Sequence, residues 1–344
     1  MTAVKKFWAV IGNPPYQEEV QGTSDKPIYN YFMDEVYEVA GRVELVTPGR
    51  FLFNAGKTPK DWNRKMLADP HLSVLDYEQV SARVFPGTDI KGGVAVTYRD
   101  GDAEIGPIEV FTPFESLRSI RKKVAKSNPS GHITDVMYLQ NKFNLVSLYE
   151  DFPDARKIIS SDGREKRIVT SSFNKLSCFS DTKQSDDEIR ILGLTQPGNR
   201  RSLKWVRHKY VEDNGNLNAY KVVLPKSNGS GALGEVLSTP LIEEPLIGYT
   251  QSFIGVGSFK DKPEAEACLK YVKSKFARTM LGILKITQDN PPEKWKYVPL
   301  QDFTSNSDID WSKPIPDIDK QLYKKYGLSK DEIEFIETHV KEMD

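Results

Sequence analysis

The residue types best suited to chemistry stand together near the start of the sequence. Asn13, Pro14, Pro15 and Tyr16 follow the apolar run Phe7–Gly12, which is typical of a short buried strand. Such a strand delivers an amide side chain, two rigid prolines and an aromatic ring into a tight loop. This combination is suited to hold a planar group that carries an NH2 and to stack on its ring.

An exocyclic NH2 such as that of adenine is a poor nucleophile, because its lone pair is delocalised into the ring. Accepting hydrogen bonds from both N–H groups favours a more tetrahedral nitrogen, and Asn13 Oδ1 and the Pro14 carbonyl are suitable acceptors. Tyr16 would stack on the base, and catalysis would be mostly positioning, without a strong general base. The alternative is a proline-rich turn in which Asn13 caps its own backbone.

The elements that must position this loop alternate between strand and helix. The helical spacing after residue 28 ends at Gly41, and Thr58 followed by Pro59 predicts the N-cap and first position of a second helix. Strands are expected at residues 7–12, 43–47, 72–77 and 93–98, and helices at residues 28–40 and 59–67. This order predicts a parallel α/β sheet with right-handed crossovers, ending in a hairpin because no long helix joins the last two strands.

Beyond about residue 105 the pattern changes. Short strands, polar loops and mixed charge predict a separate, irregular α+β domain over 106–344, after a first domain over 1–105. One long helix is expected from residue 262, with apolar residues recurring up to Leu284. A second is expected near the C-terminus, where Ser329 and Glu332 form a capping-box pattern.

The net charge is zero, but its distribution is uneven. Residues 106–210 hold 19 basic and 12 acidic side chains, a net of +7, whereas the segments on either side are weakly acidic. The middle segment is therefore the candidate surface for a polyanion. Its densest part combines positive charge with an aromatic ring, as phosphate contact and base reading require: Arg200, Arg201, Lys204, Trp205, Arg207 and Lys209. A solvated surface of ordinary charged residues is the alternative.

Composition excludes several classes of protein. No run of eighteen apolar residues is present, so we expect no membrane span, and the start of the sequence lacks a signal-peptide pattern. The two cysteines, Cys178 and Cys268, are far apart and form no zinc spacing with the four histidines; we therefore expect no metal site and a cytoplasmic location.

From Phe7 to Asp100 the sequence resembles the catalytic half of the adenine-N6 DNA methyltransferases of type II restriction–modification systems. The resemblance rests on Asn13–Tyr16, on residues 27–30, on residues 46–51 and on residues 84–93. It implies a partial Rossmann-like methyltransferase sheet, a catalytic role for Asn13, Pro14, Pro15 and Tyr16, and substrate-binding roles for Phe85 and Arg50. Phe85 as a plain core residue is the alternative.

The C-terminal part is similar to the target-recognition region of the same proteins, over residues 265–285, 298–303, 308–311 and 318–336. The resemblance thus implies a DNA-binding domain after the catalytic one. It also implies the cofactor S-adenosylmethionine, whose glycine-rich loop precedes the catalytic strand in this family. Only a dozen residues precede Asn13. Residues 253–257, Phe-Ile-Gly-Val-Gly, imitate that loop and suggest a permuted enzyme, but no acidic residue follows at the expected distance.

These observations predict a site-specific adenine-N6 methyltransferase, or its catalytic-loop and recognition portion, that acts on double-stranded DNA. A second polypeptide carrying the S-adenosylmethionine site, or a nuclease, is an expected partner. The alternative is a non-catalytic DNA-recognition subunit or remnant. A protein-glutamine methyltransferase shares the Asn-Pro-Pro-Tyr chemistry, but the large second domain with its basic centre argues against it.

Overall fold

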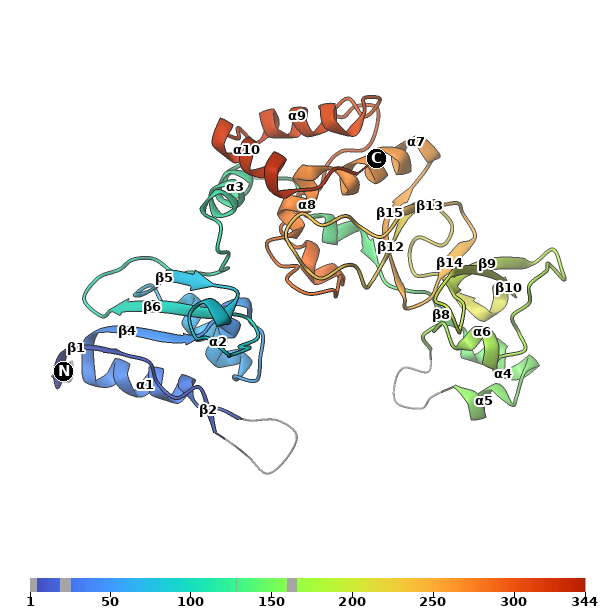
Figure 1. The fold of residues 1–344 in the computed structure, drawn as a ribbon. Coiled ribbons are helices and arrows are strands. Elements are labelled where there is room, and N and C mark those ends of the chain that lie inside the picture. Colours follow the sequence, from blue (N-terminus) through green and yellow to red (C-terminus); the bar gives the residue numbers. More distant parts are fainter. Residues whose placement is uncertain (1–4, 19–25, 128, 160–165, 344) are drawn as a thin grey trace. The chain divides into compact units, whose positions relative to one another are not determined.

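The protein is described by a computed structural model that covers residues 5–18, 26–127, 129–159 and 166–343. The chain divides into two compact units, Met1–Phe114 and Glu115–Asp344, each of which mixes helices and strands (Figure 1). The expected mixed α/β class is therefore confirmed. Within the described residues, no helix is both long enough and apolar enough to cross a membrane.

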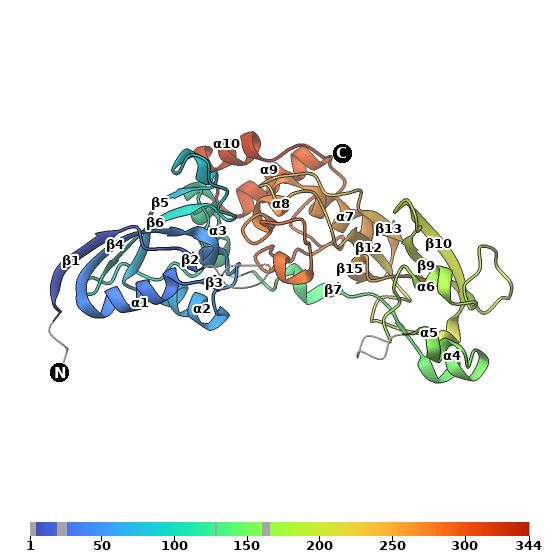
Figure 2. The same ribbon diagram turned by 60° about the horizontal axis from the view of Figure 1, so that its bottom comes forward.

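The first unit is built on a four-stranded sheet with the strand order β1-β4-β6-β5. Its elements are β1 (Phe7–Gly12), β2 (Gln17–Glu18), β3 (Lys26–Pro27), α1 (Tyr29–Val39), β4 (Ala40–Pro48), the 3-10 turn η1 (Gly49–Phe53), α2 (Lys60–Ala68), β5 (Leu72–Glu78), η2 (Ser81–Arg83) and β6 (Val94–Asp100). Figure 2 shows β1 as the outermost strand of this sheet.

The direction of the strands corrects one expectation and confirms another. β1 pairs with β4 in parallel, but β6 runs antiparallel to both of its neighbours, β4 and β5. The sheet is therefore mixed rather than parallel throughout. The cause is the connection from β5 to β6, which contains no crossover helix and returns the chain as the expected hairpin. As a result β1, β4 and β5 all run in the same direction.

An aromatic core joins the helices to the sheet in this unit. The ring of Phe51 packs edge-on against Trp62 at 5.4 Å and lies 6.3 Å from Tyr29, and all three side chains are buried. Both predicted helices begin and end within one residue of the expected bounds, but the terminal roles predicted for Gly41 and Thr58 were wrong. Gly41 does not end α1 but lies inside β4, which begins directly after the helix at Ala40. Thr58 does not cap α2, because its hydroxyl donates to Asn63 Oδ1 at 2.7 Å.

The second unit contains two larger sheets with the strand orders β10-β9-β14 and β13-β12-β15-β7, and a short pair β11-β8. Its helices are α3 (Glu115–Lys126), α4 (Leu145–Asp151), α5 (Ala155–Ile158), α6 (Ser172–Lys175), α7 (Lys262–Lys273), α8 (Lys275–Leu281), α9 (Ile315–Lys325) and α10 (Lys330–His339), with 3-10 turns η3 (Ile133–Val136), η4 (His208–Tyr210) and η5 (Pro292–Trp295). Its strands are β7 (Met137–Tyr138), β8 (Lys142–Phe143), β9 (Glu188–Leu194), β10 (Arg201–Arg207), β11 (Val211–Glu212), β12 (Tyr220–Pro225), β13 (Leu241–Glu243), β14 (Ile247–Tyr249) and β15 (Phe253–Phe259).

Capping residues set the helix boundaries near the C-terminus. The single helix expected from residue 262 is in fact two, because Ser274 leaves the helical conformation and its hydroxyl accepts the Ala277 N–H at 3.1 Å, which starts α8. The capping box at the start of α10 is confirmed. There Ser329 Oγ accepts the Glu332 N–H, and the Glu332 carboxylate accepts the Ser329 N–H at 2.7 Å.

The aromatic core generates a stability prediction for the first unit. Phe51→Ala removes a fully buried ring and leaves a cavity, so we expect the free energy of unfolding to fall by about 3–5 kcal/mol. Phe7→Ala is the matched control, because Phe7 lies in the same unit but is 56% exposed, so its removal should cost about 0.5 kcal/mol or less. Urea denaturation of both variants checks this, and equal losses would contradict the assigned core.

Candidate functional site

The Asn13–Tyr16 loop begins directly where β1 ends. Its far end is held by the backbone, since the Tyr16 carbonyl accepts the Ile28 N–H at 3.1 Å and β2 pairs with β3 beyond it. The Asn13 amide is exposed and makes no hydrogen bond to any described residue. The capping of its own backbone, which was the alternative role for Asn13, is therefore not observed.

Tyr16 turns its ring toward the core of the first unit and packs against it. The Tyr16 hydroxyl is buried, and no partner for it is found in the described part of the chain. Burial raises the pKa of Tyr16 to about 12, so the phenol is neutral across the physiological range. The residue offers an apolar ring face with an uncharged hydroxyl, as a stacking surface for a neutral base requires.

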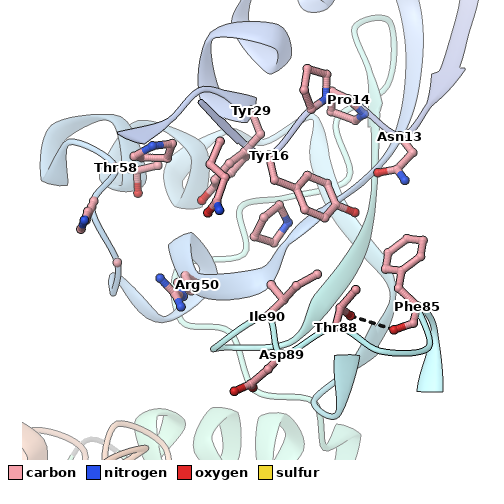
Figure 3. A pocket seen from close by; sticks show the side chains of 16 residues that line it. Asn13, Pro14, Tyr16, Tyr29, Arg50, Thr58, Phe85, Thr88, Asp89 and Ile90 are labelled. Atoms are coloured by element: carbon pink, nitrogen blue, oxygen red, sulfur yellow. Dashed lines mark hydrogen bonds between the residues drawn. The ribbon is translucent and has the colours of Figure 1, made fainter. Parts of the chain in front are cut away.

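Phe85 reaches the same place from the loop between β5 and β6. Ser81 ties this loop together: its hydroxyl donates to the Thr88 carbonyl at 3.1 Å and accepts the Ile90 N–H at 2.8 Å. Thr88 in turn donates its hydroxyl to the Phe85 carbonyl at 2.8 Å. The rings of Phe85 and Tyr16 meet edge to face, with centroids 6.3 Å apart and planes inclined by 67° (Figure 3).

A cavity of about 860 Å³ opens between these loops and lies wholly within the first unit. Its size is in the range of pockets that hold small organic ligands. Figure 3 shows Asn13, Tyr16 and Phe85 on one side of it and Arg50 and Thr58 on the other. The lining comes from the ends of β1, β4 and β5 and the segments that follow them: Asn13, Pro14, Pro15, Tyr16, Gln17, Pro27, Tyr29, Pro48, Arg50, Gly56, Lys57, Thr58, Phe85, Thr88, Asp89 and Ile90.

The structure thus brings together all six residues for which the sequence predicts a catalytic or substrate-binding role. It adds Tyr29 and Thr58, which sequence reasoning missed and which share a hydrogen bond between their side chains. A signal for this part existed in the sequence, because Gly56-Lys57-Thr58 places a glycine, a cation and a hydroxyl shortly after Arg50. That triplet reads as a helix start unless the fold is known.

The basic group that the sequence predicts to contact DNA lies along and beside β10, and three of its five cations have acidic partners. Lys204 pairs with Asp181, Arg207 Nε donates to Asp187 at 2.8 Å, and Lys209 pairs with Asp151 at 2.5 Å. The other three members of the group differ: Arg201 donates to the carbonyls of Ser238 and Thr239, Trp205 lies beneath Lys183 and Arg190, and Arg200 is exposed. DNA contact by this group stays a prediction.

The glycine-rich segment that imitates a cofactor loop does not form one. Residues 253–257 lie inside strand β15 and are buried, and β15 pairs with β12 on one side and β7 on the other. A Cβ on Gly255 would lie 2.3 Å from the Tyr249 hydroxyl, so this glycine allows close packing. The permuted arrangement is therefore wrong for this segment.

Comparison with known proteins finds a family that is similar to the first unit. Residues 2–85 match the family described as Eco57I restriction-modification methylase, and the matched segment includes Asn13–Tyr16, Arg50 and Phe85. This match confirms the resemblance to restriction–modification methylases over the segment that it covers. No curated protein matches the sequence.

Among solved structures, the chain is similar to the type IIL restriction-modification enzyme MmeI in complex with DNA. The sequences are 8% identical and the TM-score is 0.40, over 90% of this chain and 50% of the MmeI chain. The chain therefore spans about half the length of that enzyme.

The isolated Tyr16 hydroxyl leads to a second prediction. Tyr16→Phe removes a buried hydroxyl that has no partner among the described residues, so we expect the free energy of unfolding to stay the same or rise. Tyr77→Phe is the control, because its hydroxyl donates to the Gly92 carbonyl at 3.2 Å and its removal should cost about 1 kcal/mol.

Urea denaturation near pH 7 compares the two variants. The pKa of Tyr16 is raised by folding, so any stabilisation that it provides is present below about pH 10 and is lost as the pH rises through about 12. Measurement at neutral pH therefore compares proteins in which Tyr16 is neutral in both states. A destabilisation by Tyr16→Phe as large as that by Tyr77→Phe would show that the hydroxyl has a partner.

Proposed function

We propose that this chain holds the target adenine during site-specific N6 methylation of DNA in a restriction–modification system. The observation that carries the proposal is the convergence of Asn13, Tyr16 and Phe85 on one cavity. A base inside a duplex is stacked and paired, so it must be turned out of the helix to reach such a cavity. The match of residues 2–85 to restriction–modification methylases supports the reaction class.

The residues of this chain act by positioning. Asn13 Oδ1 and the Pro14 carbonyl accept hydrogen bonds from the two N–H groups on N6, and neither acceptor has a partner among the described residues. These bonds draw the nitrogen toward the geometry that exposes its lone pair. Tyr16 presents a ring face to the base, and the edge-to-face contact with Phe85 fixes the orientation of that ring. No residue of the site needs to act as a strong base, because the proton leaves after the new bond has begun to form.

The first unit supports this role as part of a larger Rossmann-like methyltransferase sheet. β1 pairs only with β4 among the described residues, and its other edge is open. Trp8 and Ile11 are 77% and 78% exposed and point to opposite faces of the sheet, because side chains alternate along a strand. Strands that are apolar on both faces belong in the interior of α/β sheets. The open edge continues into the Asn13–Tyr16 loop, and we assign it to the α/β half that binds the methyl donor.

S-adenosylmethionine is the donor that this family relation implies. The segment that imitates its glycine-rich loop, residues 253–257, lies in strand β15, and the packed glycines there do not fit the cofactor. We therefore place the donor on the half that completes the sheet at β1, whether that half belongs to the same polypeptide or to a second one. In this scheme the donor supplies the methyl group, and the present chain holds the adenine of the DNA that receives it.

We assign the second unit to target recognition on double-stranded DNA. Its basic group along β10 supports this, since Arg190 lies over the ring of Trp205 and Arg200 is exposed. A non-catalytic recognition subunit is the second candidate, and the β15 packing favours it, since this chain then holds no donor. Two measurements separate the candidates: calorimetry of this chain with duplex DNA, and methylation by the complete locus that encodes it. DNA binding without methylation would establish the recognition subunit, whereas methylation by that locus would establish the enzyme.

The role of Asn13 predicts a loss of methylation. The complete locus that encodes this chain is expressed in a host without DNA methylation, and genomic N6-methyladenine is measured by mass spectrometry and long-read sequencing. Asn13→Ala removes one acceptor of the N6 hydrogen bonds, so we expect a rate about 10²–10³-fold lower. Asn306→Ala, an exposed asparagine of the second unit, should leave methylation unchanged. Full methylation with Asn13→Ala would refute the assignment.

The open edge of β1 predicts a separate effect on assembly. Trp8→Arg and Ile11→Arg place a charge on surfaces that we assign to the donor-binding half, so methylation in the same host should fall while the chain stays folded. Leu75→Arg is the control, because Leu75 is 57% exposed on the opposite edge strand, β5. Circular dichroism confirms folding. Equal methylation by all three variants would show that β1 is an edge strand of the complete sheet.

A further inference from the structure

The side chain of Arg50 fits beside the cavity because two of its neighbours are glycines, which have no Cβ to occupy the space. Its aliphatic stem lies between Gly56 and Gly92, which have φ values of +83° and +84°. A Cβ on Gly92 would lie 2.6 Å from Arg50 Cγ, and one on Gly56 would lie 3.1 Å from Arg50 Cδ. Two separate loops, one after β4 and one before β6, thus leave room for this side chain and restrict it.

The charged end of Arg50 is fixed on one side and open on the other. Its Nε donates to the Lys91 carbonyl. No carboxylate of the described residues lies within 4 Å of the guanidinium, and Asp89, which also lines the cavity, pairs instead with Lys91 at 2.6 Å. The terminal N–H groups therefore have no hydrogen-bond partner in the described part of the chain. A planar fork of this kind binds an oxyanion with two hydrogen bonds.

The position of Arg50 indicates which oxyanion it would bind. Figure 3 shows it on the side of the cavity away from Asn13 and Phe85. In adenine, the exocyclic N6 and the sugar-bearing N9 lie at opposite ends of the ring system. A base with N6 at Asn13 therefore directs its sugar and phosphates away from Asn13. Lys57 also lines the cavity and adds a second positive charge.

We propose that Arg50 binds a backbone phosphate beside the flipped nucleotide, so that the cavity accepts a nucleotide within a strand rather than a free base or nucleoside. This inference rests on the proposed function, because it takes adenine as the occupant of the other end. Arg50 would then favour a nucleotide within a DNA strand over a free nucleoside, which has no phosphate. It also explains why the cavity is larger than a purine needs.

The test compares two probes by NMR titration of the full-length chain: adenosine, and the dinucleotide d(ApT), which adds one phosphodiester. We expect d(ApT) to bind about ten-fold more tightly than adenosine, with a gain that shrinks as salt rises. Arg50→Gln should abolish the gain of d(ApT) over adenosine. Arg50→Lys, which keeps the charge without the fork, should keep part of it. Arg64→Gln is the control, because Arg64 is exposed on α2 and pairs with Asp61.

The outcomes separate this inference from the proposed function. Loss of adenosine binding in Tyr16→Ala tests the base site. The higher affinity for d(ApT) than for adenosine tests the role of Arg50. Equal affinity of the wild-type chain for both probes, including no binding of either, would overturn the inference, as would a gain that survives Arg50→Gln. A third titration uses S-adenosylhomocysteine, which carries a carboxylate. If Arg50→Gln weakened that binding and left the d(ApT) gain intact, the oxyanion would belong to the methyl donor and the inference would fail.

Discussion

Backbone hydrogen bonds join β1 to β4 in parallel, with Gly12 opposite Leu45, and the site depends on this pairing. Asn13 follows the end of β1, and Arg50 follows the end of β4. Because parallel strands end at the same edge of a sheet, the two loops meet there. β5 runs in the same direction, so the loop that carries Phe85 emerges at this edge as well. Three segments that are distant in sequence therefore line one cavity.

The antiparallel strand β6 completes the arrangement. It returns between β4 and β5, and the loop before it brings Gly92 against the stem of Arg50. The same hairpin lets Ser81 close the loop that carries Phe85. Rigidity of the site thus comes from backbone geometry, glycines and one buried hydroxyl. A rigid site of this kind is expected where the protein holds a neutral base in place while another group reacts with it.

Sequence reasoning identified much of this site and less of the scaffold. Asn13–Tyr16 and Phe85 stand out because amide, proline and aromatic residues after a strand have a specific chemical use. Local patterns also predict the β5–β6 hairpin and the capping box at Ser329. The helix end predicted at Gly41 and the unbroken helix predicted across Ser274 were both wrong. Tertiary pairing, which local sequence does not encode, decides whether a glycine joins a strand and where a helix breaks. The placement of Arg50 between Gly56 and Gly92 depends on two loops that meet only in the fold.

The central claim is that the base to be methylated leaves the duplex and stacks against Tyr16. Photo-cross-linking tests it most directly, with a duplex in which 5-iodouracil replaces the adenine that sequencing identifies as methylated. Irradiation joins this base to an aromatic ring in contact with it, and mass spectrometry of the digested protein locates the adduct. The account predicts an adduct on Tyr16 or Phe85, in the first unit. An adduct confined to residues 115–344, such as one on Trp205, would contradict it.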